Sequence, residues 1–214
     1  MTRPARTWLF DLDNTLHNAS PHIFPHLHHA MREYIERFLG LEAAAAASLR
    51  ETYWHRYGAT LLGLMRHHGT DPRHFLDHTH RFDDLPGMVV FERPLRGMLQ
   101  KLPGRKIVFS NAPLRYTEAV LEIAGIARQF DSIWTIERLR FQPKPQLAGF
   151  RRLLHAERLD PKACVMIEDS PANLRTAKAL GMKTVLISPN PRLPAFVDLR
   201  LQSVLDLPRH LKRL

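Results

Sequence analysis

Short apolar runs alternate with longer amphipathic stretches along the second half of this chain. Runs with the length of a buried strand occur near its start and throughout that half, at residues 7–10, 106–110, 132–135, 164–168, 183–188 and 197–201. Between them, residues 114–124, 146–156 and 172–180 have helical spacing, and Gly181 stands where a helix cap would end the last of these. This alternation predicts an α/β fold, a doubly wound, Rossmann-like parallel sheet with a closing helix after the last strand.

Residues 20–92 have a different pattern, because strand-like runs disappear from this segment. Apolar residues recur there at helical spacing, and the alanine run at 43–47 adds a stretch of high helix propensity. We therefore predict a core domain formed by residues 1–19 and 93–214, with an all-helical domain formed by residues 20–92 inserted after the first strand.

The composition is that of a globular protein with a core of its own. The chain has 214 residues, of which 44% are hydrophobic. No apolar run approaches the ~20 residues needed to cross a bilayer, and residues 1–6 do not resemble a signal peptide. We therefore expect a cytoplasmic protein with no membrane partner. The formal net charge of +10 favours anionic partners, but scattered basic residues make nucleic acid an unlikely one.

Thiol and zinc chemistry find little support in the sequence. Cys164 is the single cysteine and lies within a predicted strand, where a buried, unreactive thiol is the usual situation. His74 and His78 have the spacing of zinc ligands on a helix, but they lack the glutamate that follows the first histidine of a zinc-protease helix. We interpret these histidines as part of a solvated helix surface.

Two acidic residues follow the first predicted strand, at the point where a loop begins. Asp11 and Asp13 stand two positions apart in the sequence Phe-Asp-Leu-Asp-Asn-Thr. Ligands bind at this edge of open α/β sheets, and neighbouring carboxylates repel each other unless a proton or a cation lies between them. A hard divalent ion such as Mg²⁺ is the usual partner of such a pair.

Later strand ends carry further polar groups. Ser110 and Asn111 follow the second predicted strand, and their hydroxyl and amide groups suit the oxygens of an anion. Lys144 stands between prolines that restrict its backbone and aim its ammonium group. Glu168 and Asp169 form a second acidic pair at another strand end. Each feature alone is common in loops, but their order along separate strands predicts one shared site.

With this order of motifs, the chain resembles the haloacid dehalogenase superfamily of phosphatases and phosphotransferases over nearly its whole length. Residues 11–15 look like the first motif of that superfamily, Ser110 like the second, Lys144 like the third, and Glu168 with Asp169 like the fourth. The helical insert is similar to the cap domain that closes over the active site in one subclass. Within that subclass, three segments resemble the pyrimidine 5′-nucleotidase branch, namely residues 10–16, 57–64 and 109–112.

The resemblance implies a role for each motif residue. Asp11 would be the nucleophile that forms an aspartyl-phosphate, and Asp13 would be the general acid and base. Mg²⁺ would be held by the Asp11 carboxylate, the Asp13 carbonyl and Asp169. The remaining groups would complete the site, with Ser110, Asn111 and Lys144 binding the phosphate and Glu168 and Asn173 supporting the metal ligands from just outside them.

Substrate selection would then depend on the cap, where the sequence is less explicit. Tyr53, Trp54 and Tyr57 have rings that could stack on a nucleobase, although aromatic residues at helical spacing usually belong to a core. Arg56 and Thr60 could reach a ribose or a base edge. We regard Tyr53, Arg56, Tyr57 and Thr60 as candidate specificity residues.

The function that we favour is magnesium-dependent hydrolysis of a small phosphomonoester, in the first place a nucleoside 5′-monophosphate. A phosphatase or phosphomutase acting on sugar phosphates or other small phosphomonoesters is the alternative. A dehalogenase is disfavoured because its chemistry needs no metal, whereas this chain retains Asp13 and Asp169. A non-catalytic domain that binds nucleic acid or protein would not need the complete motif set. The physiological substrate and the oligomeric state stay open at this stage.

Overall fold

A parallel sheet forms the centre of the molecule in the computed structural model, which describes residues 6–214. Its six strands have the order β3-β2-β1-β4-β5-β6. They are β1 (Thr7–Phe10), β2 (Arg105–Phe109), β3 (Ser132–Trp134), β4 (Cys164–Glu168), β5 (Lys183–Ile187) and β6 (Leu199–Leu201). The predicted parallel, doubly wound α/β sheet is confirmed, with strand ends that differ by one or two residues from the expected ones.

β1 occupies the centre of the sheet and pairs with both β2 and β4. Thr7 lies opposite Arg105 on one side and opposite Cys164 on the other. The chain adds β2 and β3 on the first side of β1, and then crosses over to add β4, β5 and β6 on the second side. A reversal of this kind leaves a crevice at the carboxyl ends of the two central strands, and Asp11 directly follows β1 there.

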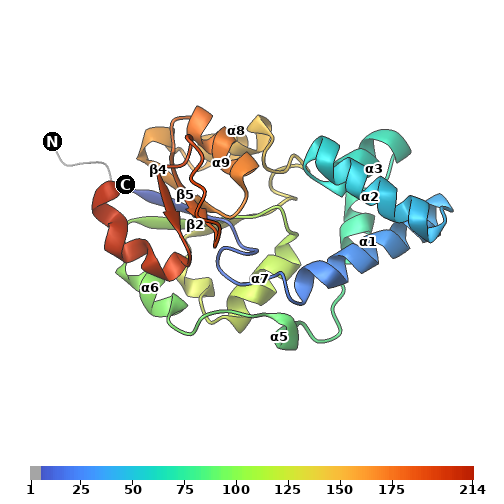
Figure 1. The fold of residues 1–214 in the computed structure, drawn as a ribbon, viewed down its shortest axis with the longest axis horizontal. Helices are drawn as coiled ribbons and strands as arrows, with labels where there is room; N and C mark the ends of the chain where they lie inside the picture. Colours follow the sequence, from blue (N-terminus) through green and yellow to red (C-terminus); the bar gives the residue numbers. More distant parts are fainter. Residues whose placement is uncertain (1–5) are drawn as a thin grey trace.

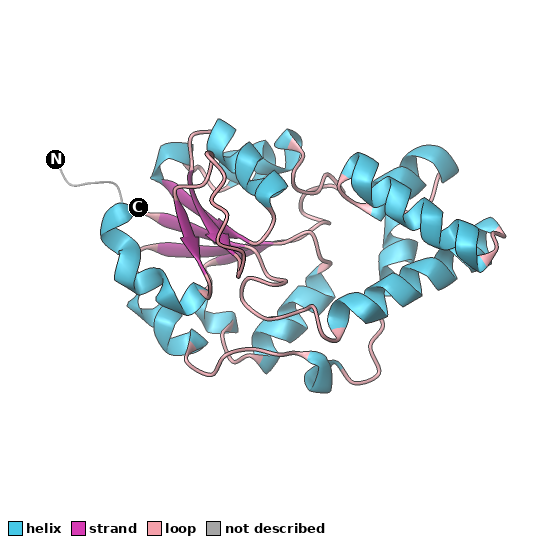
Figure 2. Cartoon of the chain, in the orientation of Figure 1, coloured by secondary structure: helices cyan, strands magenta, loops and turns pink. Residues whose placement is uncertain are grey.

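Helices cover both faces of the sheet, because side chains alternate along each buried strand (Figure 2). Trp8 and Phe10 belong to one apolar cluster, and Leu9 between them belongs to another. The first cluster includes α6 (Leu95–Lys101), α7 (Leu114–Ile123) and η3 (Val204–Arg213), and the second includes α8 (Leu147–Ala156) and α9 (Pro171–Ala179). The expected closing helix is η3, which is a 3₁₀ helix. Short 3₁₀ turns lie at η1 (Ala127–Gln129) and η2 (Pro161–Ala163).

Cys164 packs within the second cluster at the start of β4. Burial raises the pKa of its thiol to about 12, so the thiol stays protonated and weakly nucleophilic. The Cys164 side chain therefore serves the packing of the sheet, as the sequence predicted.

A helical cap, inserted after β1, lies beyond the carboxyl edge of the sheet (Figure 1). Its main helices are α1 (Ile23–Leu39), α2 (Ala43–Tyr57), α3 (Thr60–His68) and α4 (Pro72–Thr79), and α5 (Leu85–Met88) lies on the way back to the core. The cap has an apolar cluster of its own around Ile35, Leu64 and Phe75. The expected helical insert is thereby confirmed. Among residues 6–214, no helix has both the length and the apolar character of a bilayer-crossing segment.

Local sequence signals determine where the cap helices begin and end. The Asp71 side chain accepts hydrogen bonds from the first free N–H groups of α4, and Pro72 occupies the first position of that helix. Gly58 ends α2 with a left-handed backbone at φ 78°. The two crossings between cap and core lie side by side, since Asn18 N donates to Val90 O at 2.7 Å. The domain boundaries at residues 19 and 93 stay a prediction.

Candidate active site

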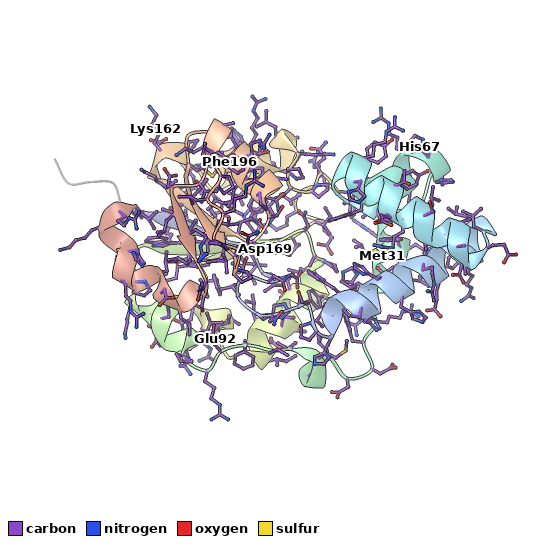
Figure 3. The ribbon with its side chains drawn as sticks, in the orientation of Figure 1. Met31, His67, Glu92, Lys162, Asp169 and Phe196 are labelled. Carbon is purple, nitrogen blue, oxygen red and sulfur yellow. The ribbon has the colours of Figure 1, made fainter. Side chains whose placement is uncertain are left out.

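A cavity of about 660 Å³ lies between the carboxyl edge of the sheet and the cap. Figure 3 shows residues from its two sides, Asp169 at the end of the sheet and Met31 on α1. The structure brings all the predicted core residues to this cavity. They come from the ends of β1, β2 and β4, the loop after β3 and the start of α9, and they are Asp11, Asp13, Ser110, Asn111, Lys144, Glu168, Asp169 and Asn173.

Lys144 holds the carboxylates of two strands together. Its Nζ atom lies 2.7 Å from Asp11 Oδ1 and 2.7 Å from Glu168 Oε2. Only 1% of the Lys144 side chain is exposed, so this ammonium group depends on its ion-pair partners. Burial by itself would lower the pKa of Lys144, but the charges of Asp11 and Glu168 hold that pKa above its ordinary value. Lys144 therefore remains positively charged.

The carboxylates around Lys144 outnumber the positive charges in contact with them. Burial raises the pKa of Asp11 to about 7, and the Glu168 charge adds to this rise while Lys144 opposes it. Burial also raises the pKa of Glu168 to about 7 and, together with the Asp11 charge, that of Asp169 to about 6. Near neutral pH the site thus needs additional positive charge for all three acids to ionise.

The same acids fit a divalent metal ion. Asp11, Glu168 and Asp169 each offer one carboxylate oxygen, and these oxygens lie within 4.8 Å of one another. Hard oxygen ligands with surplus negative charge suit Mg²⁺. Glu168 already accepts hydrogen bonds from Lys144 and, at 3.2 Å, from Ser170 N, which fits the supporting place predicted for it. The Asp11, Asp13 and Asp169 ligand set stays a prediction.

The turn after β1 positions Asp13. Asn14 has φ 59°, a left-handed conformation that asparagine tolerates well, and its Oδ1 accepts a hydrogen bond from Ala19 N at 3.0 Å. The Asp13 carboxylate accepts hydrogen bonds from the hydroxyl of Tyr116 at 2.6 Å and from Nε2 of His17 at 2.9 Å. The sequence analysis identified Asp13 but neither of its two partners.

Ser110 and Asn111 make local contacts at the end of β2. Ser110 is 1% exposed, and its Oγ accepts a hydrogen bond from Ala112 N at 3.0 Å. The Asn111 side chain donates from Nδ2 to Lys144 O at 2.9 Å and accepts from Lys144 N at 2.8 Å. Asn111 therefore fixes the backbone of Lys144, while the phosphate contacts expected of Ser110 and Asn111 stay predictions.

Three of the predicted specificity residues do not line this cavity, whose lining is fully within the described part of the chain. The Tyr53 hydroxyl is 2.8 Å from His68 Nε2, and the Tyr57 hydroxyl is 2.6 Å from His67 Nε2. The Arg56 guanidinium group lies over the Tyr57 ring. Figure 3 shows His67 at the upper edge of the cap.

A different face of α2 borders the cavity. Arg50, Trp54 and Gly58 recur every four residues and line it together with Thr60, the remaining predicted residue. The Thr60 hydroxyl donates to Arg50 O at 3.0 Å, which joins the start of α3 to α2. The cavity is also lined by four residues of α1, namely Phe24, Leu27, His28 and Met31. The i, i+4 spacing of Arg50 and Trp54 was the sequence signal for this face.

The sequence profile of the haloacid dehalogenase-like hydrolases matches residues 5–181. This match includes all the active-site residues that the core domain contributes, from Asp11 to Asn173. The chain belongs to this family.

A curated relative of this family member is Phosphate metabolism protein 8 of Saccharomyces cerevisiae, with 26% identity over 201 residues. The aligned region covers 86% of this chain and 62% of the yeast protein, so the chain spans less than two thirds of that relative's length.

Solved structures share the fold over almost the whole chain. The HAD phosphatase from Thermococcus onnurineus has a TM-score of 0.68 and 19% identity, covering 96% of this chain and 97% of its own. CbbY from Rhodobacter sphaeroides, solved in complex with phosphate, has a TM-score of 0.67 and 21% identity, and the match covers 95% of this chain and 96% of CbbY. L-2-haloacid dehalogenase from Xanthobacter autotrophicus has a TM-score of 0.62 and 14% identity, covering 97% and 98%. Since this haloacid dehalogenase-like fold occurs in both phosphatases and dehalogenases, the fold alone does not identify the reaction.

Proposed function

We propose that this protein is a magnesium-dependent phosphomonoesterase that works through an aspartyl-phosphate on Asp11. The observation that supports this most directly is the buried pairing of Asp11 and Glu168 with Lys144, at 2.7 Å each, beside Asp169. A phosphate group that approaches these acids needs compensating positive charge, which Lys144 provides from the protein. Mg²⁺, held by Asp11, Asp169 and the Asp13 carbonyl, would neutralise the remaining charge on the phosphate oxygens.

The reaction follows from the two aspartates after β1. Lys144 binds Asp11 Oδ1 at 2.7 Å, whereas Oδ2 of Asp11 accepts a longer hydrogen bond, 3.5 Å, from the Thr15 hydroxyl, so Oδ2 would be the oxygen that forms the new bond to phosphorus. As that bond forms, the bond from phosphorus to the leaving oxygen breaks, and the leaving oxygen takes its electron pair and the proton of Asp13. Water then attacks phosphorus, Asp13 takes a proton from this water, and the Asp11–phosphate bond breaks. Inorganic phosphate leaves, and both aspartates return to their starting state.

The acids around Asp11 argue against haloacid dehalogenation. A haloacid carries a carboxylate of its own, which the charges of Glu168 and Asp169 would repel. An aspartate nucleophile for that reaction needs no cluster of carboxylates around it, whereas phosphoryl transfer uses the cluster to hold a cation.

We further propose nucleoside 5′-monophosphates as the substrates. Trp54 lines the cavity and is 53% exposed, so its ring face is available to a nucleobase. Arg50 borders the same space and can donate hydrogen bonds to base or sugar oxygens. A sugar phosphate would use Arg50 but gain little from Trp54, and sugar phosphates therefore form the alternative substrate class for a phosphatase or a phosphomutase.

Phosphate release from a panel of nucleotides and sugar phosphates, with Mg²⁺ and with EDTA, tests the proposal. We expect turnover that requires Mg²⁺, and a loss of at least about 10³-fold in kcat for Asp11→Asn, because no nucleophile remains. Asp206→Asn is the matched control, since Asp206 is a surface residue paired with Arg209. Full activity of Asp11→Asn, after deamidation has been excluded by mass spectrometry, would contradict the covalent mechanism. Nucleic-acid affinity without any turnover would instead favour a binding domain.

A further inference from the structure

Two hydrogen-bond donors converge on one oxygen of Asp13. The Tyr116 hydroxyl lies 2.6 Å from Asp13 Oδ1, and His17 Nε2 lies 2.9 Å from the same atom. Tyr116 Oη and His17 Nε2 are themselves 3.3 Å apart. Tyr116 and His17 are 3% and 4% exposed, so water competes little for these bonds.

The hydrogen positions in this triad follow from its geometry. The Tyr116 hydroxyl has a single hydrogen, which it donates to the Asp13 carboxylate. Since that hydrogen points to Asp13, the Tyr116 oxygen can only accept from His17, and Nε2 of His17 therefore carries a hydrogen. Both donors stabilise negative charge on Oδ1. Within residues 6–214, Oδ2 of Asp13 receives no hydrogen bond, which leaves it as the oxygen that exchanges a proton.

We propose that Tyr116 is a positioning residue that, with His17, locks the Asp13 carboxylate so that Oδ2 faces the leaving oxygen of the substrate. This inference rests on the proposed phosphatase reaction. Without the Tyr116 hydroxyl, the carboxylate can rotate about its χ angles and lose its alignment with the substrate, although the Asp13 carboxylate itself is retained. The expected defect is therefore in proton donation to the leaving group, while binding of the phosphate group to the remaining residues continues.

The cap holds the ring of Tyr116 in place. Phe82, between α4 and α5, stacks on it with ring centroids 5.4 Å apart and an interplanar angle of 28°. His80 of the same segment lies edge-on to the ring at 5.7 Å. Tyr116 thus connects Asp13, in the core, with the segment through which the chain returns from the cap to the core. The Tyr116→Phe substitution retains these ring contacts and removes the hydroxyl alone, so it isolates the bond to Asp13.

The dependence of kcat/KM on the leaving group distinguishes positioning from a general structural role. A good leaving group such as p-nitrophenolate departs with little help from an acid, whereas an alkoxide needs a proton. We expect Tyr116→Phe to lower kcat/KM by about tenfold to a hundredfold for an alkyl phosphate, and by less than about threefold for p-nitrophenyl phosphate. Added to Asp13→Asn, the same substitution should cause almost no further loss, because the two residues act as one unit.

Tyr34→Phe is the matched control. Tyr34 is also a buried tyrosine, its hydroxyl lies 2.8 Å from His74 Nδ1 in the cap, and it does not line the active-site cavity. Any loss caused by Tyr34→Phe should be equal for both substrates. Equal losses for both substrates in Tyr116→Phe, or no loss at all, would overturn the role of Tyr116 and leave the proposed function intact. Failure of the wild-type protein to hydrolyse either substrate would overturn the proposed function, and the role of Tyr116 with it.

Discussion

At the scale of single residues, the position of Lys144 depends on a neighbour that carries no charge. Asn111 bonds both the N–H and the C=O group of Lys144, at 2.8 and 2.9 Å, across 33 positions of sequence. These two bonds fix the peptide from which the Lys144 side chain extends. Because hydrogen bonds weaken steeply with distance and angle, a shift of this peptide would weaken the contacts to Asp11 and Glu168 together.

We predict that Asn111→Ala lowers both the free energy of unfolding and kcat. The loss of two largely shielded hydrogen bonds should cost about 1–3 kcal/mol in urea unfolding, and the displaced Lys144 should reduce kcat by about tenfold or more. Asn190→Ala is the control, because Asn190 also bonds a backbone N–H, that of Arg192, but in an exposed loop. Unchanged unfolding, with a weaker competitive inhibition by phosphate as the sole effect, would instead make Asn111 a direct phosphate ligand.

The sequence predicted those site residues whose place depends on topology alone. Asp11, Ser110 and Asp169 each follow a strand. The carboxyl ends of neighbouring parallel strands lie at the same edge of the sheet, irrespective of the side chains that they carry. The contact between Asp13 and Tyr116 spans 103 positions and depends on how α7 is rotated against the sheet. The apolar pattern of α7 fixes which side of that helix is buried, but it does not show that one of the buried groups is a hydrogen-bond donor to Asp13.

At the scale of elements, one face of α2 packs inside the cap, and a neighbouring face lines the cavity. Tyr53 faces the interior of the cap, where Gly63 lies so close that a Cβ atom there would meet the Tyr53 ring. Arg50 and Trp54 lie on the neighbouring face and line the cavity. Successive helix positions are rotated by about 100°, so adjacent residues such as Tyr53 and Trp54 have different surroundings. The sequence predicted the helix correctly, but the cavity-facing side depends on how the cap docks on the core.

This arrangement predicts that Trp54 selects for a nucleobase. Trp54→Ala should raise KM for nucleoside 5′-monophosphates by about tenfold or more, since stacking of one base contributes about 1–3 kcal/mol, and should leave KM for sugar phosphates nearly unchanged. Trp54→Phe keeps an aromatic face and should restore most of the affinity. Steady-state kinetics on both substrate classes make the comparison, and equal changes in KM for both classes would exclude base stacking on Trp54.

At the scale of the whole molecule, the cap and the core enclose a local excess of acid in a chain of net charge +10. The overall charge would attract the anionic substrates of the proposed function toward the protein. Asp11, Glu168 and Asp169 act against this attraction inside the cavity unless a cation or protons neutralise them. If the cation is the Mg²⁺ of the proposed function, protons and Mg²⁺ would compete for the same carboxylates, and pH should govern how strongly the metal stabilises the fold.

The last prediction concerns thermal stability without and with Mg²⁺. The pKa values of Asp11, Glu168 and Asp169 rise to about 7, 7 and 6 in the folded protein, above the value of about 4 in an unfolded chain. Between pH 4 and 7 the folded state thus binds more protons than the unfolded state, so these acids make the metal-free protein less stable as pH rises. In the proposed function, Mg²⁺ would bind the ionised forms of these carboxylates. We therefore expect the increase in Tm caused by Mg²⁺ to be small at pH 5 and on the order of 5 °C at pH 8.

The difference in Tm with and without Mg²⁺ is the right measurement, because other groups titrate in the same range. Burial lowers the pKa of His80 to about 4, although the Asp13 charge opposes this, so His80 makes the protein more stable as pH rises from 4 to about 6.5. That contribution is largely common to the metal-free and the metal-loaded protein and cancels in the difference. Asp169→Asn removes one carboxylate from the cluster and should reduce the effect of Mg²⁺ at pH 8 by more than half. An equal effect of Mg²⁺ at both pH values, or an undiminished one in Asp169→Asn, would show that the ion binds elsewhere.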